Sequence, residues 1–169
     1  FVPFHSGKIG IYDPSDNTFD TKSINTNAYY RGGVLAPNGK IIFIPGTSTN
    51  IGIYDPSNDT FDSIYITLDN LTGNDTFSGG VLAPDGKIIC VPFHSPYVGI
   101  YDPDGGPNGS FYLGVNTGIS SNSNFEGGVL APNGKIIFVP KSYDNVGIYG
   151  TDYPLTNKLD ILMPYFNKY

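Results

Sequence analysis

The chain has 169 residues, 39% hydrophobic and 14% charged, which is enough for one globular domain with a hydrophobic core. Its formal net charge of −6, without any cluster of Lys and Arg, argues against nucleic acid as a partner. A single cysteine, Cys90, excludes a disulfide within the chain, and no stretch approaches the roughly 20 apolar residues that span a bilayer. These features leave the cellular compartment open.

Residues 1–30 contain two predicted strands joined by a turn. The first strand is IGIYD from Ile9, since β-branched and aromatic residues favour strands. The segment DPSDNTFD at 13–20 follows it, and its spaced oxygens are of a kind that can hold Ca²⁺. It lacks the central Gly and the final Glu of an EF-hand loop, however, so we interpret it as a turn stabilised by its own side chains.

Residues 31–77 carry four predicted strands. The first, GGVLA, is joined to the second, KIIFIP, by Pro-Asn-Gly, which predicts a hairpin with Gly39 in the left-handed region. The four consecutive apolar residues from Ile41 to Ile44 predict a strand that is covered on both faces, because a half-buried strand would alternate. The paired glycines at the start of GGVLA allow neighbouring backbones to crowd near an axis.

The same fourteen residues recur along the chain. They read GGVLAPNGKIIFIP at 32–45, GGVLAPDGKIICVP at 79–92 and GGVLAPNGKIIFVP at 127–140, a period of 47–48 residues. A second marker, the Gly of IGIYDP, lies in phase at 10, 52, 99 and 147. Periods of about 40–50 residues indicate propellers or helical arrays, and the strand-like composition decides for the propeller. We predict an all-β fold, a β-propeller of four-stranded antiparallel blades.

About three and a half blades are present in this prediction. They comprise a partial blade at 1–30, full blades at 31–77 and 78–125, and a partial blade at 126–150, followed by a closing or capping tail at 151–169. Because closed propellers usually have about 4–8 blades, three explanations stay open. The chain is part of a longer protein, or two copies build one ring of about seven blades, or the tail segment KLDILMP completes a four-bladed ring. Exposed strand edges invite pairing, so we expect the lone chain not to be a stable monomer.

The repeat GGVLAPNGKIIFIP…IGIYDPSNDTFDSI resembles kelch-type propeller repeats. Its Tyr-Asp-Pro at 12–14, 54–56 and 101–103 matches the kelch pattern, and Phe19, Phe61 and Phe111 lie near the position of the kelch tryptophan. The kelch double glycine and the tryptophan itself are absent. The repeat looks equally like YVTN-like propellers with SPDGK, and it is similar to GGVLAPNGK repeat proteins of uncharacterised function in large DNA viruses and some protists. The resemblance implies a fold, whereas propellers host many unrelated functions.

One face of the predicted disc carries the candidate binding residues. His5 and His94 occupy the same place in two copies of PFHS, in loops that join the second and third strands. Aromatic residues in these loops and in the loops between blades share that face, and with Asn and Ser they suit protein partners or sugars, the alternative being local packing between loops. The candidate residues are His5, His94, Phe93, Tyr97, Tyr143, Tyr29 and Tyr30.

No catalytic constellation is recognisable in the sequence. No Ser-His-Asp, Cys-His or paired-carboxylate arrangement can be assembled, and Glu126 is the sole glutamate. The neighbours of Cys90 are apolar, which predicts a buried and inert thiol. Neither histidine has carboxylate or thiolate company nearby, so we expect no metal and no cofactor.

These observations predict a non-catalytic β-propeller scaffold for protein–protein interaction, as a structural component of a larger assembly. The loops vary more than the strands, which favours a scaffold over a ligand pocket repeated in every blade. A lectin-like carbohydrate-binding module is the alternative, and part of an enzyme with its active site in a missing half or a partner chain is a third. The expected partners are another copy or the missing half of the propeller, other proteins or glycans, with no nucleic acid and no membrane.

Overall fold

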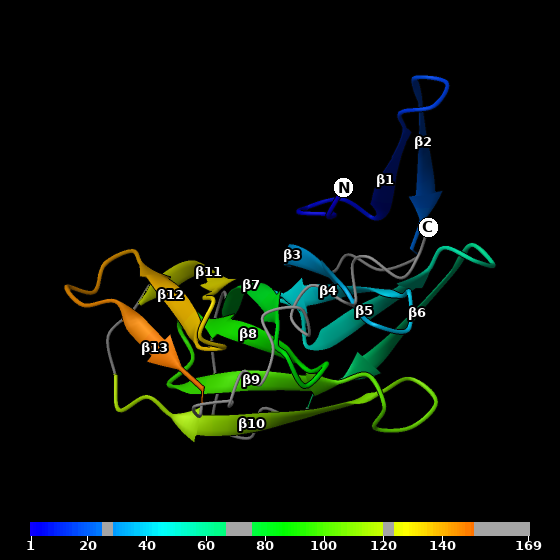
Figure 1. Cartoon of the computed structure of the whole chain (residues 1–169). Coiled ribbons are helices and arrows are strands. Elements are labelled where there is room, and N and C mark those ends of the chain that lie inside the picture. Colours follow the sequence, from blue (N-terminus) through cyan, green and yellow to red (C-terminus); the bar gives the residue numbers. More distant parts are fainter. Residues whose placement is uncertain (25–28, 67–75, 120–123, 151–169) are drawn as a thin grey trace.

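The chain folds into consecutive antiparallel sheets that follow one another around a common centre (Figure 1). The computed structural model describes residues 1–24, 29–66, 76–119 and 124–150, and every regular element in this part of the chain is a strand. The predicted all-β fold is therefore confirmed. The predicted closing tail at 151–169 lies outside the described residues. Nowhere in the described ranges is there a helix long and apolar enough to cross a membrane.

Each sheet is built from strands that are neighbours in the sequence. The first sheet contains β1 (Lys8–Asp13) and β2 (Thr18–Ser23). The second contains β3 (Tyr30–Leu35), β4 (Ile41–Pro45), β5 (Asn50–Asp55) and β6 (Thr60–Tyr65). The third contains β7 (Phe77–Leu82), β8 (Ile88–Pro92), β9 (Tyr97–Asp102) and β10 (Ser110–Asn116). The fourth contains β11 (Phe125–Leu130), β12 (Ile136–Pro140) and β13 (Gly147–Tyr149). We call these sheets blades one to four.

The Pro-Asn/Asp-Gly hairpins form as their chemistry predicts. In blade two the Gly39 amide donates to the Ala36 carbonyl at 3.0 Å, and the Ala36 amide donates to the Lys40 carbonyl at 2.8 Å. Gly39, Gly86 and Gly134 have φ of 83°, 85° and 82°, in the left-handed region where a side chain would be strained. The same hairpin therefore joins the first two strands in three blades.

Side chains of the Tyr-Asp-Pro segments close the turns between third and fourth strands. The Asp13 carboxylate accepts hydrogen bonds from the amide of Ser15 at 2.8 Å and from its hydroxyl at 2.7 Å. The Tyr12 hydroxyl donates to the Asn17 side chain at 3.0 Å. Tyr54 and Asp55 make the corresponding bonds in blade two. Oxygens of DPSDNTFD thus accept hydrogen bonds within the turn. In the described residues, no group of three His, Cys, Asp or Glu side chains could hold a metal ion.

The second strand of each inner blade is buried on both faces, as its apolar run predicts. Ile42 and Ile44 of β4 lie in one hydrophobic cluster with Ile88 and Cys90 of the following blade. Phe43 lies in another cluster, with residues of the preceding blade. Alternate residues of one strand therefore pack against the blade before and the blade after, and this packing sets the order of blades around the centre.

The innermost strands approach one another backbone to backbone. A Cβ atom built on Gly32 of β3 would lie 2.8 Å from the Cα of Gly79 in β7. One built on Gly79 would lie 3.8 Å from the Cα of Gly127 in β11. These glycines are the first of each Gly-Gly pair, so their function is the close approach of strands at the centre.

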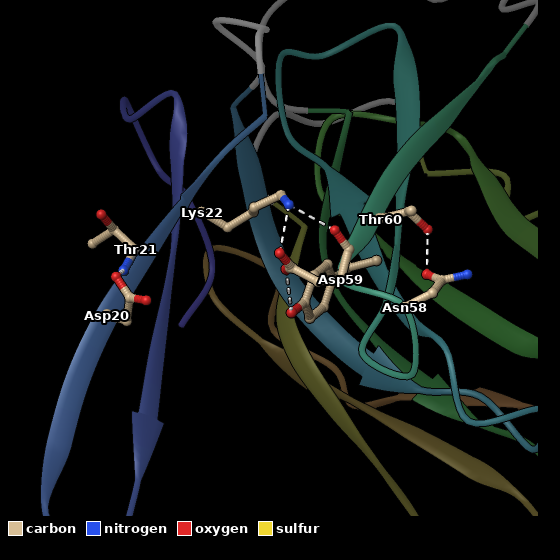
Figure 2. Close-up of polar contacts among 7 residues, drawn as sticks. Asp20, Thr21, Lys22, Asn58, Asp59 and Thr60 are labelled. Atoms are coloured by element: carbon tan, nitrogen blue, oxygen red, sulfur yellow. Dashed lines mark hydrogen bonds and ion pairs between the residues drawn. The ribbon is translucent and has the colours of Figure 1, made fainter.

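Polar contacts tie neighbouring blades at the outer rim. Figure 2 shows Lys22 of β2 reaching Asp59 in the β5–β6 turn, where its ammonium lies 2.6 Å from the carboxylate and 2.6 Å from the backbone carbonyl. In the next seam, the Asn108 amide donates to Asp62 of β6 at 2.6 Å. Both pairs are exposed to solvent, so they contribute less to stability than the apolar seams do.

Candidate functional site

Backbone hydrogen bonds fix the loops on one face of the molecule, which we call the loop face. The loop face holds the β4–β5, β8–β9 and β12–β13 loops together with the starts of β3, β7 and β11. The Thr76 amide donates to the Gly46 carbonyl at 2.9 Å, and the Asn124 amide donates to the Phe93 carbonyl at 2.9 Å. Each bond joins a loop to the residue that directly precedes the first strand of the following blade. The loop face is therefore a rigid frame on which side chains are held in place.

An open groove of about 530 Å³ lies at the centre of this face, and we call it the axial groove. Its walls come from the first residues of β3, β7 and β11, together with Val2 and Phe4 from the start of the chain. Four successive blades thus contribute to a single depression, and concave sites of roughly this size are where small ligands bind.

Three residues at equivalent repeat positions line the axial groove. They are Arg31, Ser78 and Glu126, each directly before the Gly-Gly pair. The strand register shifts at each of these positions, between Tyr30 and Gly33 in blade two and correspondingly in the other two. Such β-bulges re-aim side chains and are common beside functional sites. Arg31 is the only arginine in the chain and Glu126 the only glutamate.

The Arg31 guanidinium lies between two phenylalanine rings. Its central carbon is 5.3 Å from the ring centre of Phe4 and 5.1 Å from that of Phe93, within the range of cation–π attraction. His5 packs on Phe4 at 4.6 Å between ring centres, and His94 packs on Phe93 at 4.5 Å. The two PFHS copies, from blades one and three, therefore meet around the arginine of the blade between them.

A second cation reaches the same cluster from blade four. The Lys141 ammonium lies 4.8 Å from the ring centre of Phe93 and 3.1 Å from the Glu126 carboxylate. Arg31 and Lys141 both approach the Phe93 ring, and Glu126 neutralises one of them. The groove is consequently lined by an aromatic ring (Phe4), a cation (Arg31) and an anion (Glu126), with Phe93 and Lys141 in contact with them. This arrangement is suited to binding, and the described residues of the groove contain no recognisable nucleophile–base pair.

The structure corrects the placement of Tyr30. The sequence predicts a loop position for this residue, but Tyr30 is the first residue of β3 and only 1% of its surface is exposed. The reason is that β3 begins before Gly-Gly, with Tyr30 paired to Pro45 and its ring 5.6 Å from Phe43. Its equivalents Phe77 and Phe125 are buried in the same way.

The other predicted residues differ in accessibility. His5 is exposed with φ of 57°, and its ring lies 4.2 Å from that of the half-buried Tyr29. Phe93 is a buried residue. Tyr97 is half-buried and begins β9, outside the loop to which it was assigned. Tyr143 packs against Phe125, with 5.9 Å between ring centres.

Sequence reasoning missed Arg31, Glu126, Lys141 and Phe4 as site residues. The sequence did contain a signal for Arg31 and Glu126. The residue directly before Gly-Gly differs in all three copies of the repeat, whereas the fourteen residues that follow are almost identical. Phe4 stood within the PFHS motif but was not selected. Nothing in the sequence indicated that Lys141 pairs with Glu126, because this ion pair depends on how β11 and β12 pair.

The buried ionisable groups of Cys90 and Tyr30 are structural. Burial raises the pKa of the Cys90 thiol in β8 far above its ordinary value, so the thiol stays protonated at neutral pH and unreactive, as its apolar neighbours predict. Burial also raises the pKa of Tyr30 to about 12. Its hydroxyl has no hydrogen-bond partner in the described structure, although the nearby Ser48 offsets part of the pKa rise.

No protein-family model matches the chain, and no curated protein matches it significantly. Its shape is similar to virginiamycin B lyase from Staphylococcus aureus, with a TM-score of 0.63 at 14% identity over 88% of this chain. The neighbours share a β-propeller-like fold. The chain is part of a β-propeller.

Further structural neighbours have unrelated descriptions. An auxiliary nutrient binding protein from Bacteroides ovatus gives a TM-score of 0.55 at 16% identity, and the match covers 86% of this chain and 38% of the length of that protein. Glutaminyl cyclase from Myxococcus xanthus gives a TM-score of 0.51 at 16% identity, and the match covers 87% of this chain and 67% of the length of the cyclase. The propeller chain spans 50% of the length of the lyase. At such low identity the likeness establishes the fold alone.

Proposed function

We propose that the chain is a non-catalytic β-propeller scaffold that binds a segment of a protein partner in the axial groove. One observation carries this proposal: the only arginine and the only glutamate of the chain occupy the same repeat position in different blades, and both line the groove. Packing alone gives no reason for this, because blade three has Ser78 at that position with the same strand geometry.

The composition of the groove favours a protein partner. Arginine and aromatic residues are enriched at the centres of protein–protein interfaces, where they contribute most of the binding energy. Arg31, held between Phe4 and Phe93, is pre-organised, so little side-chain entropy is lost on binding. Glu126 and Lys141 add charges of both signs, which can fix the orientation of a bound segment.

A lectin-like site repeated in each blade is less well supported. Such a site needs equivalent residues in equivalent loops, but the loop positions that correspond to Phe4 are Gly46, Phe93 and Lys141. Sugars also stack on open aromatic faces, whereas Phe93 is buried with cations against its ring. We therefore retain glycan binding as the alternative function.

The kelch-like relationship and the absence of catalysis are also proposals. The tyrosine and aspartate of Tyr-Asp-Pro close the blade turns, which supports a kelch-like repeat but does not distinguish it from other propellers. The structural neighbours include a lyase and a cyclase, so the fold is compatible with enzymes. The groove chemistry described above supports binding.

Selection from a displayed library of random 15-residue peptides on the immobilised full chain tests the proposal, with a glycan array run in parallel. We expect saturable peptide binding that Arg31→Gln and Glu126→Gln each weaken at least about tenfold, the loss typical of one central interface residue. Lys8→Gln and Asp104→Asn are the matched controls, because both residues are exposed and lie outside the groove.

Two results would contradict protein binding at this groove. One is peptide binding that is as strong in Arg31→Gln and Glu126→Gln as in the two control variants. The other is saturable glycan binding without any enriched peptide, which would establish the lectin-like alternative.

A further inference from the structure

The two end blades present apolar faces that the inner blades bury. Each blade has a forward face, which packs on the next blade along the chain, and a backward face, which packs on the preceding one. In blades two and three the forward face includes Ile44 and Val91, both 0% exposed. At the same repeat position in blade four, Val139 is 49% exposed.

The other forward positions of blade four repeat this difference. Ile148 of β13 is 67% exposed, whereas its equivalents Ile53 and Ile100 are 2% and 7% exposed. Val129 and Val146, on β11 and in front of β13, are exposed in the same way, and their equivalents Val81 and Val98 are buried. Aliphatic side chains from three strands thus form one continuous apolar surface. Surfaces of this kind on soluble proteins mark interaction sites.

Blade one has the complementary surface on its backward face. Phe1 is 75% exposed, whereas Phe43 at the same repeat position is 2% exposed. Tyr12 is 49% exposed, whereas Tyr54 is 7% exposed. Phe19 of β2 lies against Phe1, with 5.8 Å between ring centres, and is also exposed. The backward face is therefore aromatic where the forward face is aliphatic.

The internal seams show that these two kinds of face fit together. Between blades two and three, Ile44, Ile51 and Ile53 from the forward face share one cluster with Phe77 and Tyr101 from the backward face. Between blades three and four, Val91 and Val98 share a cluster with Phe125 and Phe138. The exposed end faces carry the same residue types at the same repeat positions as these seams.

We propose that a second copy of this chain docks head to tail, so that the forward face of blade four in each copy packs on the backward face of blade one in the other. The contact is a continuation of an interface that the chain already makes between its own blades. Because both end faces of each copy are used, two copies close a ring of eight sheets, four from each copy, within the usual range of about 4–8 blades.

Native mass spectrometry and sedimentation velocity on the full chain at micromolar concentration test the proposal. We expect a species of twice the 18.2 kDa chain mass. Ile148→Asp on the forward face and Phe19→Asp on the backward face should each give the 18.2 kDa monomer. Tyr65→Asp is the matched control, because Tyr65 is 70% exposed on the outer strand β6, away from both end faces, and it should leave the doubled mass unchanged.

A mixing experiment distinguishes head-to-tail contact from a symmetric contact between like faces. Ile148→Asp retains an intact backward face and Phe19→Asp an intact forward face, so an equimolar mixture should form a mixed pair through one wild-type seam. Neither variant should associate with itself. Far-UV circular dichroism checks the fold of both, and Val146→Ser and Tyr12→Phe/Phe19→Ser replace a variant that fails this check.

Several outcomes would overturn the proposal. They are a monomeric wild-type chain, a doubled mass that survives both end-face variants, variants that do not pair on mixing, and an open series of higher oligomers in place of a closed pair. The result is independent of peptide binding in the axial groove, which Arg31→Gln alters without touching either end face.

Discussion

Removing two methyl groups from the seam between blades three and four tests whether apolar packing between blades holds the fold together. Val91 of β8 is 0% exposed and packs with Val98, Phe125 and Phe138. Val91→Ala loses about 1.6 kcal/mol of transfer free energy, at about 0.8 kcal/mol for each buried CH₂ group. The Phe93 backbone beside it is fixed by hydrogen bonds to Thr76 and Asn124, so the site collapses only partly. The residual cavity brings the expected loss to about 2–3 kcal/mol.

The same substitution at an exposed valine provides the control. Val115 of β10 is 56% exposed, so Val115→Ala should cost about 0.5 kcal/mol or less. The free energy of unfolding is measured by urea denaturation followed by circular dichroism, at one fixed chain concentration because association would add to the stability. At this chain length Val91→Ala should also lower the Tm by about 5–10 °C. Equal losses for the two variants would refute the packing argument.

Three further predictions concern Tyr30 and the centre of the molecule. Tyr30→Phe removes a buried hydroxyl without a hydrogen-bond partner and introduces the residue that blades three and four have at this position. The free energy of unfolding, measured by urea denaturation, should therefore stay the same or rise by up to about 1 kcal/mol. Burial raises the pKa of Tyr30 and Tyr101 to about 12 from 10.0. Both phenols therefore ionise at lower pH in the unfolded chain than in the folded chain, so the free energy of unfolding should fall as pH rises from about 10 to 12. The fall should be less steep in Tyr30→Phe, which lacks one of the two phenols. Stability that stays constant over this range would contradict the assignment. Gly32→Ala places a Cβ 2.8 Å from the Gly79 backbone, so it should lower the free energy of unfolding by about 1–3 kcal/mol and lower the Tm accordingly. Gly106→Ala is the control, because its Cβ meets nothing within 4 Å and the variant reports only the cost of the positive φ.

The repeating part of the fold was predictable because its causes are local. Pro-Asn/Asp-Gly fixes the hairpin through the φ of Gly39, and the apolar run in β4 requires cover on both faces. The start of the first strand was not predictable in this way. Tyr30 looked like a loop residue because it precedes Gly-Gly, and only the pairing with Pro45 across a bulge shows that the strand has already begun.

The candidate site was less predictable because its contacts join distant parts of the sequence. Phe4 and Phe93 approach Arg31 from blades that flank its own, and this depends on the curvature with which blades succeed one another. Neither hairpin chemistry nor hydrophobic period encodes that curvature. The repeat alone predicts that the two histidines share one face, but the rings that surround Arg31 beside them follow only from the assembled blades.

Near identity between blades makes functional positions visible as departures from it. Buried positions such as Ile44 and Val91 are restrained by the blade that packs on them, so they change little along the chain. The bulge residue before Gly-Gly lines the axial groove in each of blades two to four. Arg31, Ser78 and Glu126 differ in charge there although their backbones pair alike, so the charge of the groove changes from positive to negative from blade two to blade four. A segment bound as we propose would therefore have one preferred orientation. A ring of two copies would repeat this arrangement by twofold symmetry, with two arginines and two glutamates around one axis. Binding of one partner segment per ring, in place of two, would then mean that the first segment occupies the shared axis.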